Sequence, residues 1–227
     1  METIDITLPD GSKKSLPKGS NGLDLAKSIG PGLAKDAVAV VVNNEQRDLS
    51  DELSNNAEVS IITIKSNEGL EIMRHTLAAQ VLASAIKNLY PDAKLAIGPT
   101  IEDGFYYDFL PTKPISIDDL PNIEKEMKSI IGQSTQITKT YHSKNDAIAM
   151  FDNLDEGFKA EIINDSDQAD NFQIYAQDNS GFIDLCRGPH LPHLGFIGEF
   201  KLTKVSGAYW RGDSDKPMLT RIYGTAW

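Results

Sequence analysis

The stretch Asp184-Leu185-Cys186-Arg187-Gly188-Pro189-His190 places an acid, the only cysteine of the chain and a histidine within seven residues. Cys186 and His190 stand four residues apart, and Gly188-Pro189 between them indicates a turn rather than a helix. A tight turn can direct a thiol, an imidazole and a carboxylate into one pocket. Together with Arg74-His75, which falls in a predicted helix far upstream, this turn predicts a site that binds a metal or hydrolyses an ester.

The composition is that of an ordinary globular protein. The 227 residues suit one large domain or two ordinary ones, and 40% of them are hydrophobic and 24% charged. No apolar run approaches the ~20 residues of a membrane span, and the N-terminus lacks the pattern of a signal peptide. A single cysteine cannot form an intrachain disulfide, so we expect a cytoplasmic protein without a membrane partner.

The formal net charge of −11 argues against a surface that coats nucleic acid without specificity, and we expect no DNA partner. A local basic strip remains compatible with this charge. Lys201, Lys204 and Arg211, interleaved with Tyr209 and Trp210, could form such a strip for RNA. An aromatic strand with flanking charges is an equally good interpretation of these residues.

The first part of the chain has the pattern of a small α+β module. Residues 3–8 alternate like a strand, and Pro9-Asp10-Gly11 is a hairpin turn signal. Residues 22–29 form an amphipathic helical pattern, and apolar strand-like runs follow at residues 38–42 and 59–64. These elements predict a β-grasp-like unit, although composition alone favours a generic interaction module.

The pattern of residues 70–227 predicts a larger α+β domain, which follows a polar linker at residues 65–69. Helical patterns cover residues 70–89, 117–131 and 146–151. Strand-like runs are at residues 104–109, 172–175, 182–185 and 200–205. We therefore predict two α+β domains, residues 1–64 and 65–227.

Each candidate site residue also has a plainer interpretation. A lone histidine such as His75 is more often structural, and this preference reverses only if His190 lies across from it. Cys186 alone would be a small buried hydrophobe. A lone lysine such as Lys159 is usually solvated.

The chain resembles the N-terminal half of bacterial threonyl-tRNA synthetase, and the resemblance covers all of it. Residues 8–12 and 29–34 look like the opening ubiquitin-like TGS domain of that family. Motifs that look like its second domain are Arg74-His75, residues 96–99, 104–108, 184–190 and 207–213, and the closing residues 221–227.

The resemblance implies the fold and the limits of the chain. It implies a small β-grasp TGS domain followed by an α+β editing domain of the threonyl/alanyl-tRNA synthetase second-domain type. The class II catalytic core and the anticodon-binding domain would follow Trp227, and we interpret the end there as a cut. The ATP, Mg and zinc sites and the homodimer contacts are expected in that absent core, so this fragment would have no cofactor and no aminoacylation activity.

The resemblance also implies a proofreading function. Serine lacks only the methyl group of threonine, and one methyl group is worth only ~1–3 kcal/mol of discrimination. In this family the second domain hydrolyses the ester of seryl-tRNA(Thr), so the expected partner is the acceptor end of tRNA(Thr) carrying serine. A pocket that admits serine can reject threonine by a clash with the methyl group.

The resemblance assigns residues to this reaction one by one. The expected catalytic residues are His75, Lys159, Asp184, Cys186 and His190. A water is the nucleophile, His75 and His190 carry protons, Lys159 stabilises the oxyanion or holds the terminal adenosine, Asp184 binds the serine amino group, and Cys186 has a positioning role. The expected substrate-binding residues are Gln80, Gly98, Tyr107 and Tyr175, and the expected RNA-binding residues are Lys201, Lys204 and Arg211.

The sequence departs from the family at its His-x-x-x-His pattern, because the fourth residue after His75 is Ala79. The stretch is also one residue longer, which would put Gln80 in the place of the second histidine. Five residues turn a regular helix by ~500°, so Gln80 would leave the His75 face. A one-residue π-bulge would restore the facing, and we expect such a bulge between His75 and Gln80.

The same departure bears on metal. Related alanyl-tRNA editing domains place zinc on four ligands, whereas only His75, Cys186 and His190 remain here. Three protein ligands can hold a catalytic zinc, but the threonyl family works without one, and we predict no metal. Two alternatives stay open: an editing-inactive module that binds the tRNA acceptor end, and a zinc-dependent trans-editing protein.

Overall fold

The computed structural model describes residues 2–227, which divide into two units. The N-terminal unit ends at Met73 and also contains Gly188–Pro192, and the C-terminal unit contains Arg74–Arg187 and His193–Trp227. The division falls inside helix α3 (Asn67–Thr76). The predicted domain boundary between residues 64 and 65 stays a prediction.

The N-terminal unit is a five-stranded sheet with two helices. Its strands are β1 (Thr3–Thr7), β2 (Lys13–Pro17), β3 (Ala37–Val42), β4 (Glu45–Asp48) and β5 (Ala57–Thr63). They lie in the order β2-β1-β5-β3-β4, with β1 and β5 parallel and the other neighbours antiparallel. Helices α1 (Gly22–Ile29) and α2 (Pro31–Asp36) connect β2 to β3. This is the β-grasp arrangement that the hairpin signal and the helical pattern predict.

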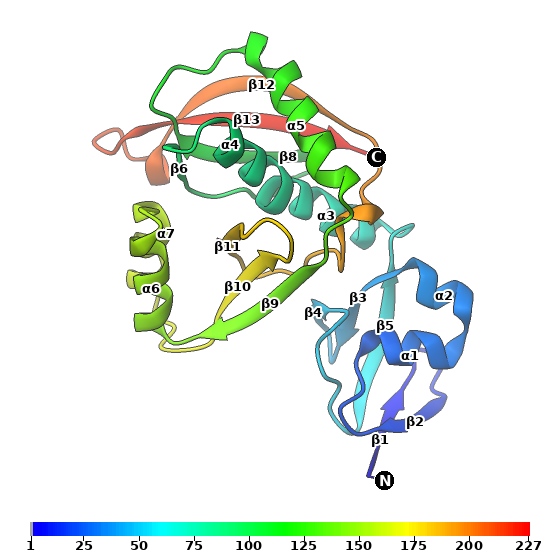
Figure 1. Ribbon diagram of the computed structural model, residues 1–227. Coiled ribbons are helices and arrows are strands. Elements are labelled where there is room, and N and C mark those ends of the chain that lie inside the picture. Colours follow the sequence, from blue (N-terminus) through cyan, green and yellow to red (C-terminus); the bar gives the residue numbers. More distant parts are fainter. Residues whose placement is uncertain (1) are drawn as a thin grey trace. The chain divides into compact units, whose positions relative to one another are not determined.

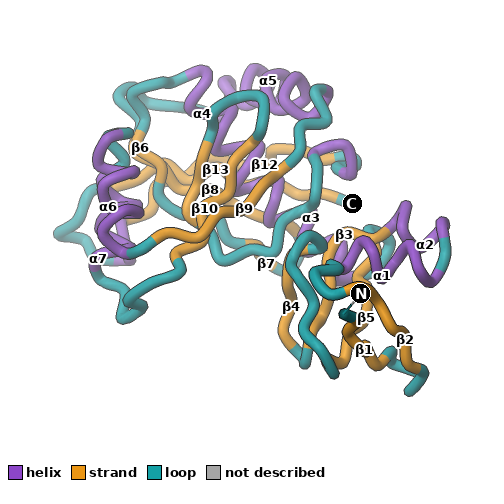
Figure 2. The backbone as a smooth tube through the Cα atoms, turned by 60° about the horizontal axis from the view of Figure 1, so that its bottom comes forward, coloured by secondary structure: helices purple, strands orange, loops and turns teal. Residues whose placement is uncertain are grey.

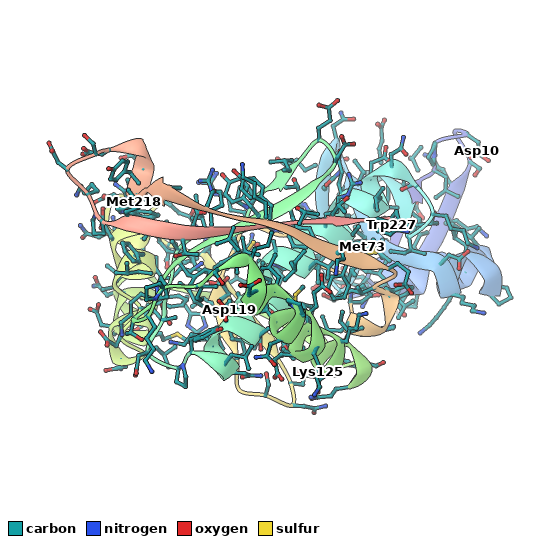
Figure 3. The ribbon with its side chains drawn as sticks, turned by 90° about the horizontal axis from the view of Figure 1, so that it is seen from above. Asp10, Met73, Asp119, Lys125, Met218 and Trp227 are labelled. Carbon is teal, nitrogen blue, oxygen red and sulfur yellow. The ribbon has the colours of Figure 1, made fainter. Side chains whose placement is uncertain are left out.

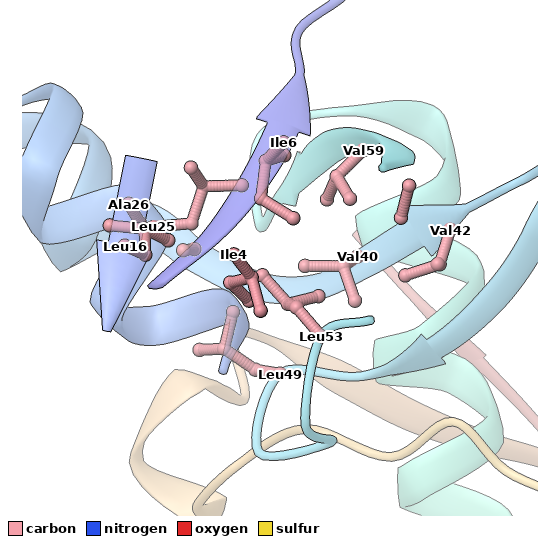
Figure 4. Close-up of a cluster of buried hydrophobic side chains, with 12 residues drawn as sticks. Ile4, Ile6, Leu16, Leu25, Ala26, Val40, Val42, Leu49, Leu53 and Val59 are labelled. Carbon is pink, nitrogen blue, oxygen red and sulfur yellow. The ribbon is translucent and has the colours of Figure 1, made fainter. Parts of the chain in front are cut away.

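The core of this unit follows from strand alternation and one amphipathic helix. Ile4 and Ile6 point inward from β1, and Leu25 and Ala26 of α1 pack in the same cluster (Figure 4). Helix α1 begins at Asn21, whose side chain accepts hydrogen bonds from the backbone N–H groups of residues 23 and 24. This cap satisfies donors that a helix start leaves without partners.

The C-terminal unit contains a second five-stranded sheet. Its strands are β6 (Lys94–Leu95), β7 (Thr100–Ile101), β8 (Gly104–Leu110), β12 (Phe200–Tyr209) and β13 (Met218–Ala226). The order is β12-β13-β8-β6, all antiparallel, and β7 pairs with β8. The π-helix η1 (Leu77–Leu82), α4 (Ala83–Leu89) and α5 (Leu120–Gly132) pack on one face (Figure 1). Met218 and Trp227 mark opposite ends of the β13 segment (Figure 3).

A smaller sheet and two helices complete this unit. Strands β9 (Ile137–His142), β10 (Phe172–Gln177) and β11 (Ile183–Leu185) form an antiparallel sheet in the order β11-β10-β9. Helices α6 (Lys144–Asn153) and α7 (Gly157–Asn164) pack against each other beside it (Figure 2). Short 3-10 turns are η2 (Ile117–Asp119), η3 (Leu194–Phe196) and η4 (Trp210–Gly212).

The predicted fold class, a mixed α+β protein, is confirmed. The predicted helices at residues 22–29, 70–89, 117–131 and 146–151 correspond to α1, the α3–η1–α4 series, η2 with α5, and α6. The sequence patterns do not predict α2, α7, β4, β6, β7, β9 or β13. Among residues 2–227, no helix combines the length and the apolar character needed to cross a bilayer.

Candidate functional site

A cavity of about 800 Å³ lies in the C-terminal unit. Residues of α3, η1, α7, β10 and β11 line it, together with the loop before β7. Six predicted site residues are among its lining: His75, Gly98, Lys159, Asp184, Cys186 and Arg211. The fold therefore brings together side chains from segments that are far apart in the sequence.

Asp184 is the most highly connected acid at this cavity. It lies on β11 and is 1% exposed. The Lys159 ammonium of α7 is 2.6 Å from its Oδ1, and the Tyr107 hydroxyl of β8 donates a hydrogen bond to its Oδ2 at 3.1 Å. The backbone N–H of Leu185 also donates to Oδ1, at 2.8 Å. One carboxylate thus joins α7, β8 and β11.

Burial controls the ionisation of this cluster. It raises the pKa of the Asp184 carboxyl, and the Lys159 ammonium and the Tyr107 hydroxyl act in the opposite direction. Burial, and then the neighbouring Asp184 charge, raise the pKa of Tyr107 well above its usual value. Tyr107 therefore remains a hydrogen-bond donor at neutral pH. Lys159 is also buried, so the expectation that a lone lysine is solvated does not describe it.

His75 and Cys186 form a second polar pair at the cavity. The Nε2 atom of His75 is 2.8 Å from the Cys186 Sγ atom, and both residues are half-buried. The backbone N–H of Cys186 donates to the Gln173 carbonyl at 3.3 Å, which extends the contacts of β11 with β10 by one residue. Arg74, next to His75, donates instead to the backbone carbonyls of Ala226 and Glu102 and is a structural residue.

The helix after His75 contains the expected π-bulge. The segment Leu77–Leu82 is a π-helix, and the Ala83 N–H donates to the Ala78 carbonyl five residues earlier. Ala79 lines the cavity together with His75. The expectation that Gln80 faces the pocket is not matched by the cavity lining, because the Gln80 side chain is fully buried beside Gln177.

Gly98 forms part of the cavity wall, and the structure leaves no room for a larger residue at this position. A Cβ atom at this position would lie 2.2 Å from Cδ2 of Tyr107 and 3.2 Å from Cβ of Ala78. Gly98 therefore allows the Tyr107 ring to lie directly behind the wall, where its hydroxyl reaches Asp184.

Besides Gln80, Tyr107 and His190, three further predicted site residues do not line the cavity. Tyr175 is buried in β10, and its hydroxyl donates to the Gln173 side chain at 3.2 Å. Lys201 is 2.9 Å from Glu124, and Lys204 lies over the Tyr223 ring. Whether these residues contact substrate or RNA stays a prediction.

His190 belongs to the N-terminal unit through residues Gly188–Pro192. Its side chain is buried, and its backbone N–H donates to the Asp48 carboxylate at 2.9 Å. Its place in a common site with His75 and Cys186 stays a prediction. The three side chains are of kinds that can hold a metal ion.

Arg211 lines the cavity and is held by acids. Its Nη1 atom is 2.7 Å from Asp165 and 3.5 Å from Glu161, and its guanidinium lies over the Trp210 ring at 5.2 Å from the centroid. The sequence analysis did not identify Arg187 and Gln173, which also line the cavity. Arg187 directly follows Cys186 in the sequence, and this position next to a predicted site residue could have identified it.

Comparisons with known proteins agree with this architecture. Residues 4–63 match the family described as TGS domain, and residues 173–223 match the family described as threonyl and alanyl tRNA synthetase second additional domain. The threonine–tRNA ligase of Francisella tularensis subsp. holarctica (strain OSU18) is 48% identical over 224 residues, or 99% of this chain and 35% of that protein. The same enzyme of subsp. novicida (strain U112) has the same identity and coverage. The chain thus spans about a third of the length of these relatives.

Proposed function

We infer, from the homology of this chain to the N-terminal region of threonine–tRNA ligases, that it carries the proofreading part of such an enzyme. Its C-terminal unit hydrolyses the ester of seryl-tRNA(Thr). The observation that carries this proposal is the cavity at which the Lys159–Asp184 and His75–Cys186 pairs meet.

A separate hydrolytic site is needed because binding energy alone cannot separate threonine from serine well enough. A pocket that binds threonine discriminates against the smaller serine by only ~10–200-fold, because the two differ by one methyl group. A second pocket that is too small for the methyl group can remove the serine product. The acceptor end of tRNA(Thr) is therefore the proposed partner of this cavity.

His75 accepts the proton of the attacking water in the proposed reaction. The water oxygen bonds to the ester carbon, the bond to the ribose oxygen breaks, and that oxygen takes up a proton. An imidazole suits this transfer because its pKa is near the working pH. Cys186 orients His75 through the 2.8 Å contact and forms no bond with the substrate.

Lys159 stabilises the developing oxyanion, and Asp184 holds the ammonium in place. A carboxylate has about four acceptor positions, and Lys159, Tyr107 and the Leu185 N–H occupy three of those on Asp184. In this proposal the remaining acceptor position on Oδ2 binds the amino group of serine. This arrangement lets one carboxylate orient both the catalytic cation and the substrate.

Only the homology supports the remaining assignments, which concern His190, metal and the complete enzyme. His190 is the proposed second proton carrier, and the reaction is proposed to need no metal. The complete enzyme would be a cytoplasmic homodimer that attaches threonine to tRNA(Thr) with ATP, Mg and a zinc in its catalytic core.

A second candidate is a binding module that has lost hydrolysis. The observation that favours it is Ala79 at the cavity wall, because an alanine side chain cannot transfer a proton. Single-turnover serine release separates the two candidates.

The test is release of serine from seryl-tRNA(Thr), with threonyl-tRNA(Thr) and a chelator in parallel reactions. We expect rapid serine release that spares threonine and ignores the chelator. His75→Gln should slow it by about 10²–10⁴-fold, whereas His142→Gln, on β9 outside the cavity lining, should not. Bound tRNA without serine release would establish the binding module, and inhibition by the chelator would establish a metal-dependent reaction.

A further inference from the structure

The π-helix after His75 interrupts the regular hydrogen bonding of this helix. The Ala83 N–H donates to the Ala78 carbonyl, five residues back, and α4 then resumes ordinary α-helical spacing. A helix that returns from five-residue to four-residue spacing passes over one carbonyl group, which here is that of Ala79, because the next N–H, that of Ser84, falls on Gln80 at four-residue spacing. A missing hydrogen bond inside a buried helix is costly, so contacts from outside the helix are needed to stabilise such a turn.

Gln177 supplies a contact from outside the helix, at the residue that follows the skipped carbonyl. Its Nε2 atom, on β10, donates to the backbone carbonyl of Gln80 at 2.7 Å. Gln177 is 2% exposed and Gln80 is 0% exposed, so water does not compete for this bond. The bond joins residues 97 positions apart in the sequence.

We propose that Gln177 is a positioning residue that holds the π turn and thereby directs His75 toward Cys186. One residue turns an α-helix by about 100°. Downstream, Ala83, Ala85 and Ile86 are fully buried and fix the rotation of α4. A helix that lost the π turn while α4 stayed in place would rotate the His75 side by about this angle, away from the cavity.

The backbone of Gln80, not its side chain, carries this role. The Gln80 Nε2 atom is buried and has no hydrogen-bond partner among residues 2–227, and its Oε1 is 3.5 Å from Gln177 Nε2. Replacing this amide by an apolar group of similar size should leave the main-chain bond intact. Gln80→Leu is therefore the matched control for Gln177→Leu.

The test uses Cys186, the only cysteine of the chain, as a reporter of the position of His75. The rate of Cys186 alkylation by iodoacetamide is measured with and without His75→Ala. In the unaltered chain and in Gln80→Leu, loss of the imidazole should change the rate by at least about two-fold, the lower end of coupling between residues in contact. In Gln177→Leu it should have no effect, because the contact is already lost. An equal effect of His75→Ala in all three backgrounds would overturn the proposal.

Deletion of Gln80 keeps the test decisive if Gln177→Leu does not fold. Without the extra residue the helix can run at regular spacing and contains no π turn for Gln177 to hold, so the deletion should restore folding of Gln177→Leu. Failure to restore it would also overturn the proposal. This inference rests on the proposed function only in one respect, the catalytic role given to His75. The role of Gln177 in positioning His75 does not depend on it. A chain that shows this coupling but releases no serine would contradict the proofreading function and leave the role of Gln177 intact.

Discussion

Asp184 shows what a short sequence motif can and cannot predict about a residue. Its place beside the only cysteine identified it as a site residue, and it does line the cavity. The sequence did not indicate that Lys159 of a distant helix would be its partner, 2.6 Å away. A buried carboxylate needs a counter-charge, but only the fold selects which lysine supplies it.

Lys159→Met tests this pair through stability. Removing the lysine leaves a buried carboxylate uncompensated, so the free energy of unfolding near neutral pH should fall by about 3–5 kcal/mol. The pKa of Asp184 is already raised by burial, and losing the Lys159 ammonium raises it further. An aspartate whose folded-state pKa is raised lowers stability above that pKa and has no such effect once both states are protonated.

The loss should therefore shrink as pH falls through the raised pKa of Asp184. Urea unfolding at a series of pH values measures it. A loss that is the same at acidic and neutral pH would contradict this account. Lys201→Met, which removes an exposed partner of Glu124, should cost less than about 1 kcal/mol.

At the scale of elements, segments with a clear apolar period were predictable and segments with a weak one were not. The apolar period over residues 70–89 predicted a helix, and the extra residue beside His75 predicted its π-bulge. Helices α1 and α7 both have 8 residues, but the apolar residues of α1 gather on one side, whereas those of α7 do not form a clear apolar face, so only α1 was predictable. Strand β13 contains Gly224 in its interior, and glycine weakens a strand pattern, so residues 221–227 stand out as a family motif but not as a strand.

A partly buried ion pair between Arg221 of β13 and Asp108 of β8 adds to the pairing of these strands, and Arg221→Met tests its contribution. Arg221 forms two hydrogen bonds with Asp108, at 2.7 and 2.8 Å, and its guanidinium lies 3.8 Å from the centroid of the Tyr106 ring. Asp108 is 3% exposed, so we expect a loss of about 3 kcal/mol in the free energy of unfolding. Chemical denaturation measures it.

Arg47→Met is the matched control, because Arg47 pairs with an exposed Glu45 on the N-terminal unit. Its loss should stay below about 1 kcal/mol. Equal losses for the two arginines would show that the Asp108 pair contributes no more than a surface contact.

For the whole molecule, motif order predicted the two-part architecture, and matches at residues 4–63 and 173–223 agree with it. The assignment of His190 was beyond sequence reasoning. Asp184 and Cys186 belong to the C-terminal unit, whereas His190, four residues later, belongs to the N-terminal unit. The spacing of Cys186 and His190 along the chain does not tell which unit each of the two residues will pack against.

The net charge of −11 predicts weakly salt-dependent RNA binding. If Lys201, Lys204, Arg187 and Arg211 contact phosphates, log K should fall with log salt concentration with a slope of about −3.6 at most. Fluorescence anisotropy with tRNA between 50 and 200 mM salt, concentrations at which this dependence is usually seen, measures the slope.

Lys204→Ala should reduce the slope by about 1. Lys125→Ala, on the exposed side of α5, should leave it unchanged. A slope twice as steep, or equal effects of the two substitutions, would place the RNA on other parts of the protein.

The hydrogen bond between the His190 N–H and Asp48 links residues 142 positions apart within the N-terminal unit. A ribosome adds about 5–20 residues per second, so about 7–28 s separate the synthesis of these two positions. The first module to emerge therefore waits for 142 further residues before this contact can form. Its early, incomplete form is a distinct species during translation, and a nascent chain released before residue 188 would never acquire that closing segment.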